Sequence, residues 1–117
     1  MMKKEYRMKK NSEIDAIFKR KQVKADSYFS VYQGIDPEAS HFRFALSIGK
    51  KYGNAVARNL MKRRIRMIVS DQKDFLKKQA LFVIVIKPKS KILTFSEIQT
   101  QILLLLKKSK LLENTHE

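Results

Sequence analysis

The sequence predicts one domain of the α/β (α+β) class, with the order helix, antiparallel hairpin, helix, strand, helix. Two observations lead to this prediction. The chain has 117 residues, of which 44% are hydrophobic, and this is the size and composition of a single folded domain. Segments with helical spacing of apolar residues also alternate with segments in which every second residue is apolar. We therefore treat residues 1–117 as one domain, with flexibility expected only in residues 1–10 and 109–117.

The first predicted helix begins at Asn11 or Ser12 and ends near Lys21. Acidic residues in its first turn suit the positive end of the helix dipole. Its apolar residues lie three and four positions apart, at Ile14, Ile17 and Phe18. This spacing predicts one face that packs against the rest of the domain.

Residues 27–33 and 42–48 are predicted to form two strands, because apolar and other side chains alternate in each segment. The connection between them contains Gly34 and Pro37, which favour a turn. We therefore expect an antiparallel hairpin with one strongly apolar face. Residues 23–25 would add a short strand at its edge.

A second helix is predicted from about residue 55 to residue 69, with Asn54 as its N-cap. Its apolar residues share one side, and three cations spaced four residues apart share another. The apolar side holds Ala57, Met61, Ile65 and Ile68, and the cationic side holds Arg58, Lys62 and Arg66. One side should pack against the domain, and the other should present a row of positive charge.

The last two predicted elements are a buried strand and a helix. Residues 80–86 are all apolar and rich in β-branched side chains, as expected of a strand that is buried on both faces. Thr94 and Glu97 form a capping-box pattern before a leucine-rich segment. We expect this helix to end near Lys108 and to cover the sheet.

The charge of the chain is strongly positive and unevenly distributed. Lys and Arg number 26 and Asp and Glu 11, which gives a formal net charge of +15. No Asp or Glu occurs in residues 41–70, although residues 50–66 alone hold seven cations. Such a stretch repels itself unless a polyanion neutralises it, whereas a solvated helix face normally interleaves both signs. We favour the polyanion, and hence a nucleic acid, over the solvated face.

Several classes of protein are excluded by what the sequence lacks. It has no Cys, so it has neither disulfides nor thiolate-bound zinc or iron–sulfur clusters. Its longest apolar run has seven residues, and no apolar segment follows its charged N-terminal residues. We therefore expect neither a signal peptide nor a membrane span. These features predict a cytoplasmic protein that does not bind membranes.

An independent protein active site is not expected. Neither of the two histidines, His41 and His116, lies near a constellation of Ser, Asp or Glu residues in the sequence. Acidic pairs have simpler explanations, as for Glu13 and Asp15, which belong to a helix start. A nuclease normally needs a pair of histidines or a carboxylate cluster. We therefore predict no catalytic residue and no metal site in the protein itself.

The aromatic residues indicate a surface for single-stranded nucleic acid. Two tyrosines of the first predicted strand lie on the face opposite the core, and the matching residues of the second strand are too small to cover them. With the first helix at the edge, this face would be a shallow groove lined by Ile14, Phe18, Tyr28, Tyr32 and Ser47. Bases stack on such rings while nearby cations hold phosphates. The alternative is that these rings complete a second layer of core.

The segment KKYGNAVARNLMKRRIR, residues 50–66, resembles the signature of the bacterial ribonuclease P protein subunit. In that family a Lys-Lys turn precedes Gly-Asn-Ala-Val, and Arg-Asn and further cations follow on one helix. The segment MKKNSEIDAIFK, residues 8–19, is similar to the first helix of the family. The resemblance implies a small mixed sheet, with a left-handed crossover between the strand before the signature helix and the strand after it.

The resemblance also implies a function in tRNA maturation. Subunits of this family hold the catalytic RNA and the single-stranded 5′ leader of precursor tRNA, while the RNA carries out the cleavage. The implied partners are the catalytic RNA subunit and precursor tRNA, with no protein partner. The implied cofactor is magnesium, bound mainly by the RNA subunit.

Two sets of site residues follow from the resemblance by position. The set that faces the catalytic RNA and the cleavage site is Lys50, Lys51, Asn54, Arg58, Asn59, Lys62, Arg63 and Arg66. The leader-binding cleft matches Ile14, Phe18, Tyr32 and Ser47, to which the alternation pattern adds Tyr28. The chain departs from the family pattern at Ile14, Leu60 and Ile86. Two alternatives stay open: a structural RNA-binding protein of the ribosomal type, and a nuclease that acts without RNA.

Overall fold

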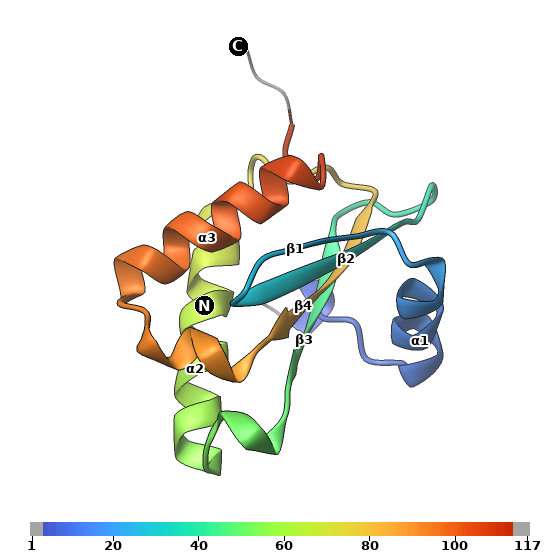
Figure 1. Ribbon diagram of the computed structural model, residues 1–117. Helices are drawn as coiled ribbons and strands as arrows, with labels where there is room; N and C mark the ends of the chain where they lie inside the picture. The colour runs from blue at the N-terminus through green and yellow to red at the C-terminus, as the bar shows by residue number, and fades with distance from the viewer. Residues whose placement is uncertain (1–3, 114–117) are drawn as a thin grey trace.

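The computed structural model describes residues 4–113 and shows a four-stranded sheet with helices on both faces (Figure 1). Short 3₁₀ helices are labelled η. In chain order the elements are η1 (Lys4–Tyr6), α1 (Asn11–Arg20), β1 (Val23–Ala25), β2 (Phe29–Ile35), β3 (Arg43–Ile48), η2 (Lys50–Tyr52), α2 (Ala55–Asp71), β4 (Ala80–Ile86), η3 (Pro88–Ile92) and α3 (Phe95–Lys108). The α+β class is thus confirmed.

The sheet is mixed, with the strand order β1-β2-β4-β3. β1 pairs antiparallel with β2, β2 pairs antiparallel with β4, and β4 pairs parallel with β3. The parallel pair is connected through α2, as the family resemblance implies. The left-handedness of that crossover stays a prediction.

The predicted hairpin between β2 and β3 is wrong, because β4 lies between these strands and pairs with both. The alternation of side chains determines which face each strand presents, but it does not determine which strand is its neighbour. β4 is apolar on both sides, and a central position buries such a strand without leaving an exposed edge. The hairpin that does form joins β1 to β2. In its turn the Asp26 carboxylate accepts hydrogen bonds from the backbone N–H groups of Tyr28 (2.7 Å) and Phe29 (2.8 Å).

The main core lies between one face of the sheet and the helices α2 and α3, which are to the left of the strands in Figure 1. The predicted apolar side of α2 contributes to this core, since Met61, Ile65 and Ile68 are each at most 1% exposed. The side chains of Phe29, Val31, Phe44, Phe82 and Ile84 meet them from the sheet. This packing leaves the other side of α2 facing outward.

α1 packs on the opposite face of the sheet through a smaller cluster built on Met8, Ile17 and Val83. The helix approaches β2 closely at Gly34, where an added Cβ would lie 3.3 Å from Ile17 Cγ1. Phe18 and Tyr32 pack against the same cluster but remain partly exposed. α1 therefore covers only part of this face.

The predicted helix starts are confirmed. Asn54 caps α2, with its side-chain oxygen accepting from the Ala57 N–H at 2.9 Å. Thr94 and Glu97 form a reciprocal capping box at the start of α3. α2 extends two residues beyond the predicted end, to Asp71, and β4 has the predicted bounds.

The described parts of the two terminal segments pack against the domain. Met8 and Leu111 are each 5% exposed, and Arg7 forms an isolated parallel bridge with Phe44 of β3. Residues 1–3 and 114–117 lie outside the described residues, so the expected flexibility of the ends stays a prediction. No helix within residues 4–113 is long and apolar enough to cross a membrane.

Candidate RNA interface

The outward side of α2 carries a groove rich in cations, with a volume of about 630 Å³. Four of the predicted RNA-contact residues lie together in it, namely Asn59, Lys62, Arg63 and Arg66. Arg7 enters the same groove from the N-terminal segment. Lys62 and Arg66 of the predicted row of cations therefore share one surface, to which a second part of the chain contributes, while Arg58 does not line the groove.

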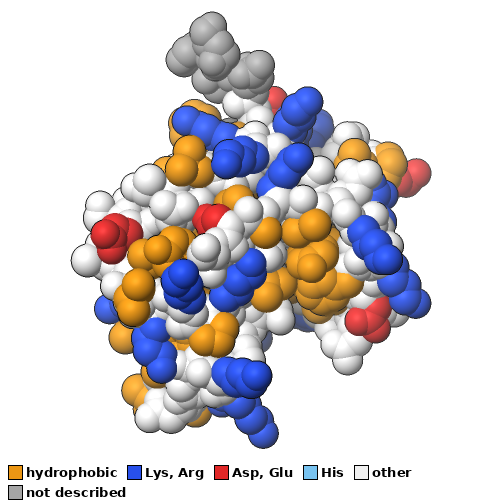
Figure 2. Space-filling model, viewed as in Figure 1, with side chains coloured by type: hydrophobic (Ala, Val, Ile, Leu, Met, Phe, Trp, Pro, Cys, Tyr) orange, Lys and Arg blue, Asp and Glu red, His pale blue; other side chains and the backbone are white. Residues whose placement is uncertain are grey.

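A second group of cations lies where β3 and β4 end. Because these strands are parallel and Ile48 lies opposite Ile86, the segments that follow them, η2 and η3, emerge at the same edge of the sheet. Lys50 and Lys51 on η2 are exposed, as a role in RNA binding requires. Figure 2 shows blue side chains in the lower part of the view, where Figure 1 places η2 and the start of α2.

η3 adds lysines that the sequence analysis missed. Lys91 Nζ lies 5.4 Å from the centre of the Tyr52 ring, and Lys89 Nζ lies 5.9 Å from the centre of the Tyr28 ring. Burial raises the pKa of the Tyr52 hydroxyl above its ordinary value, and the nearby charge of Arg64 opposes this rise. The signal that could have identified these lysines is their recurrence directly after a buried strand. These lysines lie beside η2 only because β3 and β4 pair in parallel, and the sequence did not show that pairing.

Asn54 has a structural role as well as a predicted role in binding. Its Oδ1 atom caps α2, and the backbone N–H of Arg58 donates to the Asn54 carbonyl at 3.0 Å. The exposed side chain has no other hydrogen-bond partner among the described residues, which leaves its amide nitrogen able to donate to RNA. Arg58 is half-buried on the turn that follows.

Four of the five predicted leader-binding residues, Ile14, Phe18, Tyr32 and Ser47, lie on the sheet face beside α1. The rings of Phe18 and Tyr32 contact edge to face, with centroids 4.8 Å apart and planes at 79°. Ile14 and Val85 pack against the same cluster, and Ser47 lies opposite Val85 in the register of the sheet. Figure 2 shows hydrophobic side chains exposed beside α1. We call this surface, formed by Ile14, Phe18, Tyr32, Ser47 and Val85, the aromatic face.

Tyr28 does not belong to the aromatic face, which corrects the prediction from alternation. It precedes β2 in the turn after β1, so it is outside the regular pleat that would have placed it beside Tyr32. Its ring packs partly against the main core, which is on the other side of the sheet. The remaining surface of Tyr28 adjoins Lys89 on η3.

Arg7 and Arg66 join the two surfaces. Both line the groove on α2, and both also line a smaller hollow of about 180 Å³ that reaches Ile14 and Ala45 at the margin of the aromatic face. Burial lowers the pKa of the Arg66 guanidinium, and the positive charge of Arg7 lowers it further. The Arg7 Nε atom is buried without a hydrogen-bond partner.

No carboxylate within residues 4–113 forms an ion pair with either guanidinium, since the ion pairs of this part of the chain all involve Arg43. Two like charges held together in this way favour an anion between them. Arg7 was not among the predicted residues, although Met8 beside it, an apolar residue in a basic segment, was a sign that this segment packs.

The described residues do not fit a metal centre held by the protein. Residues 4–113 contain no group of three or more His, Asp or Glu side chains that could hold a metal ion. His41 lies with its Nδ1 atom 2.9 Å from the Phe42 carbonyl oxygen, which is a structural contact, and His116 lies outside the described residues.

The comparisons with known proteins agree with this geometry. The family model described as Ribonuclease P matches residues 2–110. The chain is 45% identical over 112 residues to the ribonuclease P protein component of Acholeplasma laidlawii, and these residues make up 96% of each chain. It is 38% identical over 112 residues to that of Enterococcus faecalis, covering 96% of this chain and 95% of the relative.

Solved structures show the same fold. The RNase P protein of Staphylococcus aureus is 34% identical, with a TM-score of 0.85 over 91% of this chain and 96% of that one. The RNase P protein of Thermotoga maritima, 24% identical, has a TM-score of 0.79 over 87% of this chain and 96% of that one, which supports the fold alone. With the family model spanning nearly the whole chain, this protein belongs to the family of bacterial ribonuclease P protein components.

Proposed function

We propose that this chain is the protein subunit of a ribonuclease P holoenzyme, in which it binds the catalytic RNA and the 5′ leader of precursor tRNA. Membership of the family implies a subunit of an endoribonuclease that forms the 5′ end of tRNA. In this proposal the RNA cleaves the phosphodiester bond. The protein contributes affinity and position, in keeping with the lack, within residues 4–113, of a group of three or more His, Asp or Glu side chains that could hold a metal ion.

The groove on α2 and the lysines of η2 and η3 would hold the catalytic RNA. Each Lys or Arg that neutralises a phosphate releases a counterion, so affinity gained in this way falls steeply as salt increases. Neutralisation also reduces the repulsion between the phosphates of the catalytic RNA and those of the substrate. The high net charge of +15 suits this role.

The aromatic face would receive the leader. Rings such as Phe18 and Tyr32 stack with bases irrespective of sequence, which suits a segment that differs from one precursor tRNA to the next. Because mature tRNA lacks the leader, contacts made there favour binding of the substrate over the product. This difference in affinity is the physical basis of the protein's proposed contribution.

Magnesium belongs to the RNA in this proposal. The described carboxylates do not cluster, and two of them, Glu13 and Asp36, are engaged by Arg43. Residues 4–113 therefore offer no fitting site for the ion, and none of them is assigned to metal chemistry. We expect the holoenzyme to act in the cytoplasm.

One observation supports the proposal most directly: Arg7 and Arg66 line both the groove on α2 and the hollow at the margin of the aromatic face. RNA bound on α2 and a leader bound on the aromatic face would therefore meet at the same pair of guanidinium groups. Such a junction is expected where substrate and catalytic RNA come together.

The test is cleavage of precursor tRNA by the cognate catalytic RNA at limiting magnesium, with and without the full-length protein. We expect the protein to increase the rate and to tighten binding of precursor tRNA over mature tRNA. Lys62→Gln should reduce both effects, whereas Lys107→Gln, which removes the same charge from α3, should not. RNA binding without any effect on cleavage would contradict the proposal and favour a structural RNA-binding protein. Cleavage by the protein free of RNA would favour a nuclease that acts alone.

A further inference from the structure

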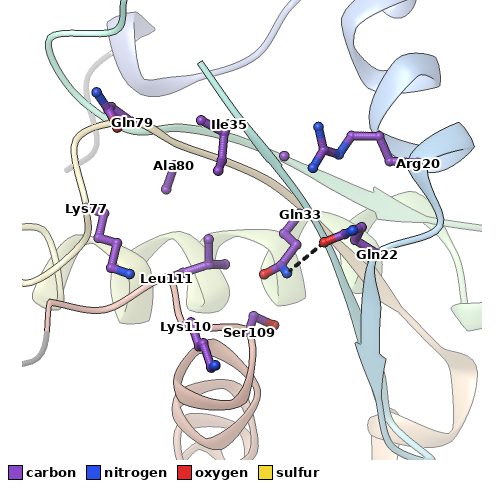
Figure 3. A pocket seen from close by; sticks show the side chains of 11 residues that line it. Arg20, Gln22, Gln33, Ile35, Lys77, Gln79, Ala80, Ser109, Lys110 and Leu111 are labelled. Atoms are coloured by element: carbon purple, nitrogen blue, oxygen red, sulfur yellow. Dashed lines mark hydrogen bonds between the residues drawn. The ribbon is translucent and has the colours of Figure 1, made fainter. Parts of the chain in front are cut away.

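A hollow of about 340 Å³ lies where four segments distant in the sequence meet (Figure 3). The end of α1, the end of β2, the loop before β4 and the residues after α3 form its walls. None of the residues assigned above to RNA binding lines it. Its volume falls within the range of about 300 to 1,000 Å³ that is usual for small-molecule sites.

The walls of this hollow are held in place by backbone hydrogen bonds. The Lys77 N–H donates to the Leu111 carbonyl at 3.0 Å, and the Leu111 N–H donates to the Leu106 carbonyl at 3.1 Å. Between Leu106 and Leu111 the chain reverses its direction at Lys110, whose backbone is left-handed with φ of 59°. The hollow is thus formed by the fold itself rather than by mobile side chains alone.

Two polar atoms at the hollow are buried without a hydrogen-bond partner among the described residues: Gln33 Oε1 and Ser109 Oγ. Ser109 is 4% exposed, so water has little access to its hydroxyl from outside. The Gln33 amide is oriented by its Nε2 atom, which donates to Gln22 Oε1 at 3.5 Å, and its oxygen is left free. Leaving a buried polar atom unpaired is unfavourable, so both atoms favour a bound partner.

The charge at the hollow is of one sign. Arg20, Lys77 and Lys110 are among the lining residues, and none of the eleven lining residues is acidic. Figure 3 shows the side chains of Arg20 and Lys77 extending toward the hollow from opposite sides. Ile35, Ala80 and Leu111 add apolar wall between them.

We propose that this hollow is a nucleotide-binding site. A nucleotide offers what the lining requires: a phosphate for Arg20 and Lys77, and a flat base whose faces can pack against the wall that contains Ile35. Its amino or hydroxyl groups can donate to Gln33 Oε1, which can only accept, and bond with Ser109 Oγ. The nucleotide is either free in solution or an internal residue of bound RNA, because both present the same groups.

The first measurement is a titration of the full-length protein with AMP, GMP, CMP and UMP, followed by the backbone amide resonances. We expect saturable shifts at Lys77, Ser109 and Lys110 with at least one nucleotide, and smaller shifts with inorganic phosphate. The second measurement is the affinity of the catalytic RNA for the variants below. Nucleotide shifts with unchanged RNA affinity would identify a free nucleotide, and reduced RNA affinity without nucleotide shifts would identify an internal residue of RNA.

The variants separate binding from folding. Ser109→Ala removes an unpaired hydroxyl, so we expect no loss of thermal stability, together with about fivefold weaker binding, which is the loss of one hydrogen bond. Lys77→Gln should weaken binding similarly, whereas Lys107→Gln, with the same loss of charge outside the hollow, should not. The proposal is overturned if shifts occur only at α2, or if no variant alters the binding of nucleotide or RNA. It is also overturned if Ser109→Ala lowers stability and leaves binding intact. None of these outcomes depends on whether the protein stimulates cleavage of precursor tRNA.

Discussion

Arg43 on β3 and Glu13 on α1 form a two-bond ion pair, with Nη1 donating to Oε1 at 3.0 Å and Nη2 donating to Oε2 at 2.9 Å. Arg43 also reaches the Asp36 carboxylate at 3.4 Å. The pair joins the helix that carries Phe18 to the strand that carries Ser47. It therefore helps to fix the distance between the two sides of the aromatic face.

This pair predicts a pH dependence of stability. The hydrogen bonds from Arg43 lower the pKa of the Glu13 carboxyl below its ordinary value. The folded state therefore favours the charged form, and its contribution to stability is complete above the ordinary Glu pKa of about 4.3 and is lost as the pH falls through the lowered pKa. Glu13→Gln should lower the unfolding temperature at neutral pH, and this effect should shrink as the pH falls through the lowered pKa of Glu13. Glu38→Gln, at an exposed carboxylate outside the ion pairs, is the control; an effect of Glu13→Gln that stays constant down to acid pH would contradict the assignment.

The close approach at Gly34 predicts that side chains there displace α1. A Cβ would already lie 3.3 Å from Ile17 Cγ1, and the branches of Val would overlap it. Gly34→Val should cost about 1 to 3 kcal/mol of stability, although Val is favoured in strands, and it should also weaken leader binding. Gly49→Ala is the control, because nothing lies within 4 Å of its Cβ and its backbone is extended. Unchanged stability of Gly34→Val would show that α1 does not depend on this contact.

The sequence was informative where local patterns decide the structure. Asn54 and the pair Thr94 and Glu97 are caps whose geometry depends on a few neighbouring residues, and all were predicted correctly. The apolar side of α2 followed from helical spacing in the same way. The meeting of Phe18 with Tyr32 was also predicted, because amphipathic patterns give the inward face of each element.

Features that depend on the order of strands were not predictable. The alternation in β2 and β3 is equally compatible with a hairpin and with a third strand between them, and the distant segment β4 decides the outcome. The same parallel pairing brings the lysines of η3 beside η2, and the packing of Met8 brings Arg7 to Arg66. Each of these contacts joins residues more than 30 positions apart, which no local spacing encodes. Tyr28 was misplaced because the strand begins at Phe29, two residues later than the alternation suggests.

Asn54 allows the cap and the RNA contact to be separated. Asn54→Ala should cost about 1 kcal/mol of stability, because the Ala57 N–H loses its acceptor. Asn54→Asp keeps an acceptor of the same shape at the positive end of the helix, so stability should be retained. It also adds a negative charge close to Lys50 and Lys51, and RNA binding should weaken. Thermal unfolding and RNA affinity should be measured on both variants. If Asn54→Asp binds RNA with full affinity, Asn54 is not part of the RNA interface.

The aromatic face predicts effects that depend on the leader. Phe18→Leu keeps an apolar side chain against the cluster but removes a ring, so the protein should stay folded. The free energy of binding to precursor tRNA should become less favourable by about 1 to 3 kcal/mol, which is the usual contribution of one stacked base. The affinity for mature tRNA should not change. Tyr32→Phe retains its ring and should bind normally. If Phe18→Leu instead unfolds the protein and leaves the affinity ratio unchanged, the two rings are core.

Arg7 and Arg66 predict a coupled loss of RNA binding. Arg7→Gln and Arg66→Gln should each reduce the steepness of the plot of log affinity against log salt concentration by about the contribution of one phosphate contact. If both guanidiniums hold the same phosphate, the double variant should lose less affinity than the sum of the two single losses. Neither change should lower the unfolding temperature of the free protein, because each removes a charge that is repelled by the other. Additive losses would place the two side chains on separate phosphates, and a fall in unfolding temperature would show that the pair stabilises the fold by contacts other than charge.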